Sequence, residues 1–154
     1  MTARTLSAVS AVALAFVAGS LSSLPAREQD RRYFNARTPG DPNVTPFSGA
    51  VQAGNTVYLS GTLGLGPNRT RPETAEAEAT NVLNNVKAQL ESAGLTMDDL
   101  VVVQVFASDT ADYDAFNRVY RTYFTKEFPA RAFLGAGPLL FGARFEVQGI
   151  AVKR

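Results

Sequence analysis

Residues 100–107 read Leu-Val-Val-Val-Gln-Val-Phe-Ala, a run in which apolar and β-branched side chains occupy both parities. Such a run is typical of an inner β-strand that is covered on both faces of its sheet. Helices can cover one face, and the other face then needs a partner. Since burying apolar surface contributes about 25 cal/mol per Å², we expect the chain to bury that second face by forming an oligomer.

Two helices are predicted, one on either side of this strand. In residues 73–93 the apolar side chains recur at the three-and-four spacing of a helix face, and Gly94 supplies the stop. Glu78 and two other glutamates near the start of this segment suit the positive end of the helix dipole. Asp109 or Asp112 can cap the second helix, whose aromatic side chains follow one stripe. Aromatic residues at this spacing belong far more often to a core than to a cofactor site.

The remaining apolar segments predict strands. Gly54-Asn55 favours a tight hairpin turn between the first two of them, whereas the segment from Gly61 to Pro72 has the composition of a loop. The order strand-strand-helix-strand-helix-strand-strand is typical of an α+β domain, with one mixed sheet and both helices on one of its faces. In chain order, the strands are expected at residues 50–53, 56–60, 100–107, 133–137 and 145–152.

Residues 1–26 differ in composition from the rest of the chain. Arg4 precedes an unbroken run of apolar and small residues from Leu6 to Ala18, and further small residues and a proline follow. These are the parts of a secretory signal peptide, and the run is shorter than the ~20 residues of a membrane span. We therefore expect an exported protein, periplasmic or secreted, that has no membrane contact after removal of the signal. An N-terminal hydrophobic helix, packed on the domain or anchored in a membrane, is the alternative.

Residues 27–46 are rich in Arg, Asp, Asn and Pro, and we expect a polar, mostly irregular arm there, followed by one domain at residues 47–154. The whole chain carries 15 Lys and Arg against 14 Asp and Glu. Removal of the signal removes one arginine and leaves a domain without net charge. This balance argues against nucleic acid as a partner, because nucleic-acid binding relies on clustered cations.

The chain has no histidine and no cysteine. This absence excludes a Ser-His-Asp triad, a thiol nucleophile and a His/Cys zinc site, and we expect neither a metal nor a cofactor. Two candidate site residues stand near the C-terminus, Arg131 in a Pro-Ala-Arg segment and Glu146 in the last predicted strand. On pattern alone, Arg131 is equally well a salt-bridge residue. Glu146 alternates with Phe145 and Val147, as an ordinary outward residue of a strand does.

A set of segments in residues 43–154 resembles, in order, the Rid family of small trimeric enamine/imine deaminases, also called YjgF-type proteins. The resemblance implies a chorismate-mutase-like fold, in which three copies pack around a barrel of sheet faces and form sites at their interfaces. It is carried by Val51-Gln52 with Gly54-Asn55, Leu59-Ser60-Gly61, Asn84 to Leu95, Val103 to Phe106, Phe116-Asn117, Phe128 to Arg131, and Glu146 to Val152.

The resemblance also implies a reaction, the hydrolysis of a small reactive enamine or imine acid to a 2-keto acid and ammonia. Arg131 matches the arginine that holds the substrate carboxylate, and a guanidinium offers two parallel donors to such a group. Glu146 matches the glutamate that activates the attacking water, a role that suits a general base. The resemblance places Ser60, Gly61, Asn117 and Phe133 in the substrate-binding pocket.

Three positions depart from the family pattern. Ala50 stands where many members carry a tyrosine, and Thr62 stands where a glutamine often follows Ser-Gly. Phe133 replaces a smaller residue and is expected to narrow the pocket. A retained arginine and glutamate with altered walls favour a related reaction on a different acid, or a lost activity.

Two further functions stay open at this point. One is a non-catalytic trimeric module that captures a small carboxylate or amine ligand outside the cytoplasm. The other is the ribonuclease activity sometimes ascribed to the family, which the zero net charge and the absence of histidine disfavour.

Overall fold

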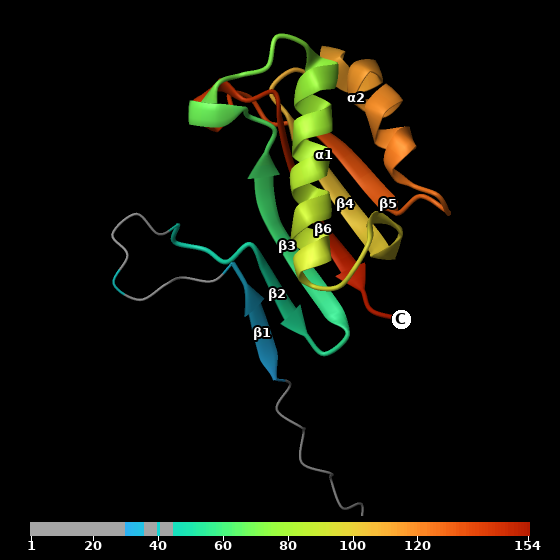
Figure 1. The fold of residues 1–154 in the computed structure, drawn as a ribbon. Coiled ribbons are helices and arrows are strands. Elements are labelled where there is room, and N and C mark those ends of the chain that lie inside the picture. The colour runs from blue at the N-terminus through green and yellow to red at the C-terminus, as the bar shows by residue number, and fades with distance from the viewer. Residues whose placement is uncertain (1–29, 36–39, 41–44) are drawn as a thin grey trace, which may run out of the picture.

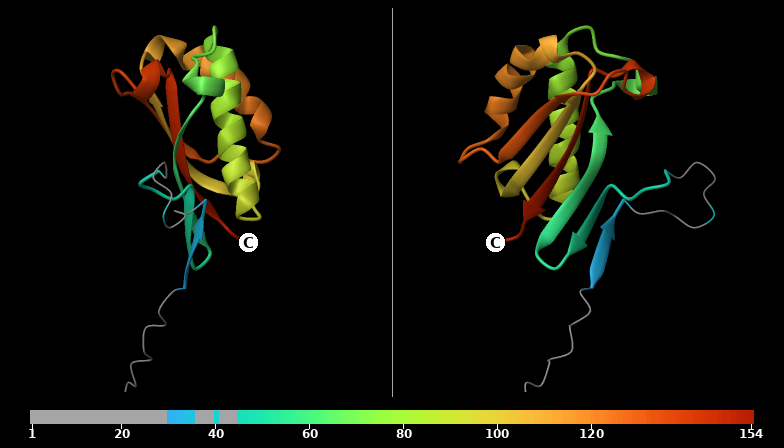
Figure 2. Two further views of the ribbon diagram at one scale, coloured as in Figure 1. Left: turned by 60° about the vertical axis from the view of Figure 1, so that its left-hand side comes forward. Right: turned by 180° about the vertical axis from the view of Figure 1, so that it is seen from behind.

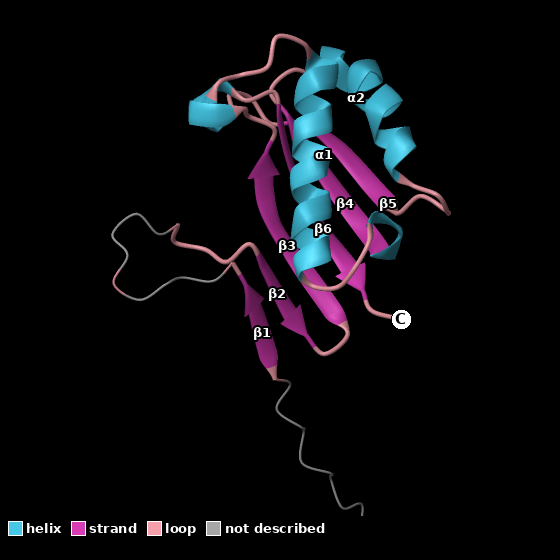
Figure 3. Cartoon of the chain, viewed as in Figure 1, coloured by secondary structure: helices cyan, strands magenta, loops and turns pink. Residues whose placement is uncertain are grey.

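The computed structural model describes residues 30–35, 40 and 45–154, and these form a two-layer α+β domain (Figures 1 and 3). The predicted signal peptide lies outside the described residues. The strands are β1 (Arg31–Phe34), β2 (Ala50–Ala53), β3 (Thr56–Leu63), β4 (Leu100–Ala107), β5 (Ala130–Gly135) and β6 (Phe145–Val152). The helices are α1 (Ala75–Ser92) and α2 (Tyr113–Tyr120), with short 3₁₀ turns η1 (Pro67–Arg69), η2 (Met97–Asp99), η3 (Thr110–Asp112), η4 (Arg121–Tyr123) and η5 (Leu140–Gly142).

The six strands form one mixed sheet in the order β1-β2-β3-β6-β4-β5. Only β4 and β5 run parallel to each other, and every other neighbouring pair is antiparallel. Both helices lie against the same face of this sheet (Figure 2). The predicted fold class and the inner position of the strand at residues 100–107 are thereby confirmed.

Helix α1 ends as its sequence predicts. Thr74 caps the N-terminus by accepting a hydrogen bond from the Ala77 amide at 3.1 Å. At the other end Gly94 takes a φ of +75°, and the Leu95 amide donates to the Leu90 carbonyl at 2.9 Å. A left-handed glycine with this bond closes the last helical turn. The predicted apolar face is buried along its whole length, from Ala75 to Ala93.

The core lies between the helices and the sheet. It joins the buried face of α1 to Phe116 of α2 and to one parity of the strands, including Val103, Val105 and Val147. The opposite sheet face is uncovered in a single copy of the chain. Large apolar side chains remain accessible there, with Tyr58 49% and Leu134 44% exposed.

Three strand predictions needed correction. Residues 31–34 belong to β1 and are not irregular, because they pair with β2 and bury Phe34 against the core. β3 continues to Leu63, so that Gly61 lies in a strand and not in a loop. β5 begins at Ala130, three residues earlier than predicted, so that it contains Arg131.

A buried carboxylate fixes the start of β6. Glu78 of α1 is fully buried, and it accepts hydrogen bonds from the backbone amides of Arg144 and Phe145 at 2.5 and 3.1 Å. The Arg144 guanidinium completes the contact with an ion pair to Glu78 at 3.2 Å. Glu78 therefore holds the residues immediately before Glu146 in place, a role beyond the helix dipole. None of the helices in the described part of the chain has the length and apolar character needed to cross a bilayer.

Candidate functional site

Arg131 lies under helix α2, on the helix-covered face of the sheet. Its β4 partner in the register is Val103, which is buried in the core. The Arg131 Nη2 donates a hydrogen bond to the Asn117 Oδ1 at 2.7 Å, and the guanidinium carbon lies 4.5 Å from the centre of the Tyr120 ring. These residues, with Tyr113 and Phe128 among others, line a cavity of about 230 Å³. Asn117 and Arg131, two residues of the predicted site, therefore lie together at one cavity.

Two polar groups in this cluster lack a partner. The Arg131 Nη1 and the Tyr120 hydroxyl are buried without a hydrogen bond. In the described part of the chain, no carboxylate forms an ion pair with Arg131, so the salt-bridge interpretation has no support within one copy. A buried donor without an acceptor costs about 1–3 kcal/mol, and more when it is charged. The cluster is thus prepared for an acceptor that one copy of the chain does not provide.

Burial also changes the acidity of Tyr120. Desolvation raises the pKa of this phenol to about 12, although the neighbouring Arg131 charge acts in the opposite direction. The hydroxyl therefore stays protonated at neutral pH and can act as a hydrogen-bond donor to an incoming anion.

Glu146 lies on the other, open face of the sheet, beside Ser60 and Gly61. The β3–β6 register shifts between Leu59 and Thr62, so that Ser60 and Gly61 form an irregularity in the strand. Bulges of this kind often redirect side chains next to active sites. A Cβ atom on Gly61 would lie 2.1 Å from the Glu146 Oε1. Glycine is therefore needed at this position to leave room for the carboxylate.

Ser60 uses its own donors to hold the segment before β2. Its hydroxyl donates to the Ser48 carbonyl at 2.6 Å, and its backbone amide donates to the Gly49 carbonyl at 3.0 Å. The neighbouring Phe47 lines a second cavity, of about 570 Å³. The cavity is lined by Thr45, Phe47, Leu59, Ser60, Gly61, Leu63, Arg69, Leu140, Phe141, Glu146 and Gln148.

Two strained loops meet at this cavity. Arg69 at the end of η1 and Phe141 in η5 both have positive φ angles, +60° and +57°, and neither is a glycine. The Arg69 guanidinium lies over the Phe141 ring, 4.1 Å from its centre. Figures 1 and 2 show the two loops side by side at the same end of the sheet. Left-handed backbone at non-glycine residues costs on the order of 1–3 kcal/mol and tends to cluster at functional sites.

The two predicted catalytic residues do not meet within one copy. Arg131 pairs in register with a buried residue of β4, and Glu146 pairs with Phe106, which points to the open face. The sheet itself therefore separates the guanidinium from the carboxylate. A site that uses both residues needs two copies of the chain.

Three predicted pocket positions lie elsewhere. Ala50 is 1% exposed and faces the core. The aromatic side chains at the Glu146 cavity are those of Phe47 and Phe141, which the sequence analysis missed. Thr62 pairs with Val147, a core residue, and does not line either cavity. Phe133 packs edge-on against Tyr113, with ring centres 5.1 Å apart, and lines neither cavity in a single copy.

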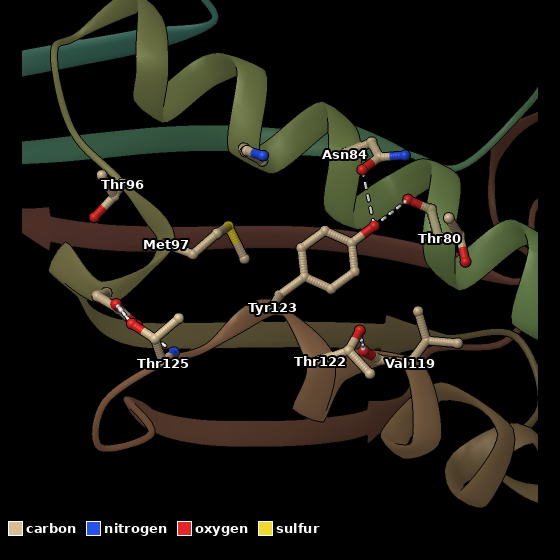
Figure 4. Close-up of a pocket in the computed structure, with 10 residues that line it drawn as sticks. Thr80, Asn84, Thr96, Met97, Val119, Thr122, Tyr123 and Thr125 are labelled. Atoms are coloured by element: carbon tan, nitrogen blue, oxygen red, sulfur yellow. Dashed lines mark hydrogen bonds between the residues drawn. The ribbon is translucent and has the colours of Figure 1, made fainter.

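A third hollow, about 530 Å³ in volume, lies between α1 and the end of α2 and holds none of the predicted site residues (Figure 4). Its polar groups are largely bonded to each other. The Tyr123 hydroxyl contacts the Asn84 Oδ1 at 2.8 Å and the Thr80 carbonyl at 3.1 Å. In the described residues, no group of three or more carboxylate, histidine or cysteine side chains forms a metal-binding cluster.

Comparison with known families gives a single answer. The family model described as endoribonuclease L-PSP, which represents the RidA/YjgF proteins, matches residues 39–153. The chain belongs to the Rid family. Among curated Rid proteins, the 2-iminobutanoate/2-iminopropanoate deaminase of Dermatophagoides farinae is 39% identical over 71% of this chain and 87% of its own length. The protein of the same name from Escherichia coli K12 is 34% identical over 72% of this chain and 90% of its own length.

Solved Rid structures have the same fold. The E. coli YjgF gene product is 31% identical, covers 80% of this chain over 100% of its own length, and superimposes with a TM-score of 0.70. RidA from an Antarctic Psychrobacter species is 31% identical, with 82% and 99% coverage and a TM-score of 0.67. E. coli TdcF, crystallised with bound serine, is 29% identical, with 72% and 91% coverage and a TM-score of 0.68. The expected Rid fold of the single chain, one mixed sheet with two helices, is thereby confirmed.

Proposed function

We propose that this protein hydrolyses small 2-imino or 2-enamino acids to 2-keto acids and ammonia, at sites formed between two copies of the chain. The observation that carries the proposal is the Arg131 cluster, in which a buried guanidinium nitrogen and the Tyr120 hydroxyl both lack an acceptor. A substrate carboxylate supplies acceptors to both. The names of the curated relatives, 2-iminobutanoate/2-iminopropanoate deaminases, support the same reaction.

Glu146 performs the chemical step in this proposal. Its carboxylate takes a proton from water while the water oxygen bonds to the imine carbon, and it passes that proton to the imine nitrogen, which gives a carbinolamine. The carboxylate then takes the proton of the new hydroxyl and passes it to the amino nitrogen, so that the C–N bond breaks and ammonia leaves as the carbonyl forms. A positioned general base of this kind contributes roughly 10²–10⁴ in rate. Gly61 supports the step because it leaves the space that the Glu146 carboxylate occupies.

A homotrimer is the proposed assembly. The open sheet face carries exposed Tyr58 and Leu134 together with half-buried Val102, Phe106 and Ile150. Apolar side chains of this number are normally covered by a partner. A closed ring brings the edge that carries Arg131 in one copy toward the Glu146 face of the next. Light scattering of residues 27–154 tests the assembly, and a stable monomer at micromolar concentration contradicts it.

The composition of residues 1–26 supports export of the protein to the periplasm or the exterior. The mature chain is then expected to begin between Leu21 and Arg27. N-terminal sequencing of the native protein tests this point, and a chain that begins at Met1 or Thr2 argues against export.

The decisive experiment measures ammonia release from freshly generated 2-iminopropanoate by residues 27–154 and two variants. Glu146→Gln keeps the shape of the side chain but removes the base, so turnover should fall by roughly 10² or more with ligand binding retained. Arg131→Lys keeps the charge but loses the paired donors, so kcat/KM should fall about tenfold or more. If both variants release ammonia as fast as the wild type, the assignment of Arg131 and Glu146 to the site is refuted. A wild type that binds pyruvate through Arg131 without releasing ammonia identifies the non-catalytic binding module instead.

A further inference from the structure

The Glu146 cavity contains a cation that the proposed reaction does not use. Arg69 is the one Lys or Arg among the described residues that line this cavity. It belongs to η1, in the loop between β3 and α1, whereas Glu146 belongs to β6. Arg69 and Glu146 form no ion pair, and no other described carboxylate pairs with Arg69.

The Arg69 guanidinium is held by a contact of its face and not by an ion pair. The side chain lies over the Phe141 ring at 4.1 Å, and such a contact leaves the edge of the guanidinium plane free to donate hydrogen bonds. The backbones of Asn68, Arg69 and Phe141 all take left-handed conformations. These two loops therefore position one arginine against one aromatic ring at the wall of the cavity, although neither loop has a glycine at those positions.

In a single copy of the chain, the cavity is also larger than a three-carbon acid requires. Its volume of about 570 Å³ lies well inside the range of small-molecule pockets. Besides Glu146 and Arg69, the lining of the cavity includes the apolar side chains of Leu63, Leu140 and Phe141. A short chain of methylene groups fits such a wall, and an anionic end group fits the arginine beyond it.

We propose that Arg69 is a specificity-determining residue that binds a second carboxylate, so that the preferred substrates are imines of four- and five-carbon dicarboxylic amino acids. This inference rests on the proposed function, in which the first carboxylate binds Arg131 and Glu146 activates water. Arg69 takes no part in the chemical step. It favours 2-iminosuccinate and 2-iminoglutarate over 2-iminopropanoate by pairing with the carboxylate that only the two longer acids possess.

The test compares kcat/KM for the three imines, generated in the assay by an oxidase acting on aspartate, glutamate and alanine. The wild type should favour at least one dicarboxylic imine by about tenfold or more, and Arg69→Met should remove that preference by lowering kcat/KM for the dicarboxylic imines about tenfold more than for 2-iminopropanoate. Arg69→Lys should restore part of the preference, because it keeps the charge without the paired donors. Arg71→Met is the matched control, since Arg71 is an exposed arginine of the same loop that does not line the cavity.

The outcomes separate this inference from the proposed function. If the wild type hydrolyses 2-iminopropanoate but Arg69→Met does not change its substrate preference, the role of Arg69 is overturned and the deaminase proposal stays intact. If no imine is hydrolysed, the deaminase proposal fails, and calorimetry with 2-oxoglutarate and pyruvate decides the role of Arg69. Tighter binding of 2-oxoglutarate that is lost in Arg69→Met supports the second carboxylate site. Equal binding of the two acids, or binding of neither, overturns it.

Discussion

Because Arg131 and Glu146 lie on opposite faces of one sheet, two inactive variants should restore each other's activity. In the wild type the Arg131 guanidinium carbon lies 4.5 Å from the centre of the Tyr120 ring. Arg131→Met keeps an aliphatic stem beside this ring but removes every charged donor. Glu146→Gln removes only the base. Each variant alone should lose activity by roughly 10- to 100-fold or more, from lost charge-assisted hydrogen bonds in the first case and lost base catalysis in the second.

The size of the recovery follows from the geometry. If each site takes its arginine from one copy and its glutamate from the next, a random equal mixture leaves both residues intact at about one quarter of the sites. The mixture should therefore reach about one quarter of wild-type activity. A control mixes the wild type with the double variant. Sites shared between copies again give about one quarter, whereas sites within single copies give about one half.

The assay unfolds the two variants together in denaturant, refolds them as a mixture, and measures ammonia release per milligram from 2-iminopropanoate. Mixing the folded variants without exchange supplies the baseline. A refolded mixture that stays at the baseline, together with about half of the wild-type activity in the control mixture, would refute the two-copy site.

Three further predictions follow from the packing. Gly61→Ala should lower turnover at least about tenfold with little change in melting temperature, because its Cβ would lie 2.1 Å from the movable Glu146 carboxylate. Gly64→Ala should instead cost roughly 1–3 kcal/mol of stability, because its Cβ would lie 2.2 Å from the Glu78 backbone carbonyl. Melting curves and turnover of both variants check this contrast. Glu78→Ala should destabilise the fold by about 3–5 kcal/mol in urea titrations, because it removes the ion pair to Arg144 and leaves the backbone amides of Arg144 and Phe145 without their acceptor. The pKa of Tyr120 is about 12 in the folded chain against 10 in the unfolded chain, so the neutral phenol stabilises the fold fully below pH 10 and this contribution is lost as pH rises through 12. The unfolding free energy of Tyr120→Phe should therefore fall less steeply than that of the wild type between pH 10 and 12. Identical slopes for the two proteins would contradict the assignment.

Local patterns in the sequence account for most of the elements. Three of these patterns involve only residues close together in sequence, and the structure confirms all three. They are the spacing of apolar side chains in α1, the apolar residues at both parities of β4, and the glycine after α1. β1 was missed because Arg31 to Phe34 has no strong pattern of its own. Its strand conformation depends on pairing with β2, about twenty residues away in sequence.

The candidate site was likewise predictable from the sequence only in part. The roles of Arg131 and Glu146 in carboxylate binding and base catalysis could be named from the sequence only through the resemblance to the Rid family, because on pattern alone Arg131 is equally well a salt-bridge residue and Glu146 an ordinary strand residue. The position of these two side chains on opposite faces of the sheet could not be predicted from the sequence. It depends on strand register, and a shift of one residue moves a side chain to the opposite face of the sheet. The contributions of Tyr120 and Phe47 were missed for the same reason, since each joins the site through contacts between distant elements.

The sequence by itself determined the α+β class, the two helices, the inner strand and the residue types available for chemistry, because these depend on composition and short-range periodicity. Only the tertiary structure decided that Glu78 anchors the start of β6, that Arg69 enters the Glu146 cavity, and that the sheet divides Arg131 from Glu146. The physical reason is common to all three. Each depends on which strands become neighbours and in what register, and that choice is made by the packing of the whole chain.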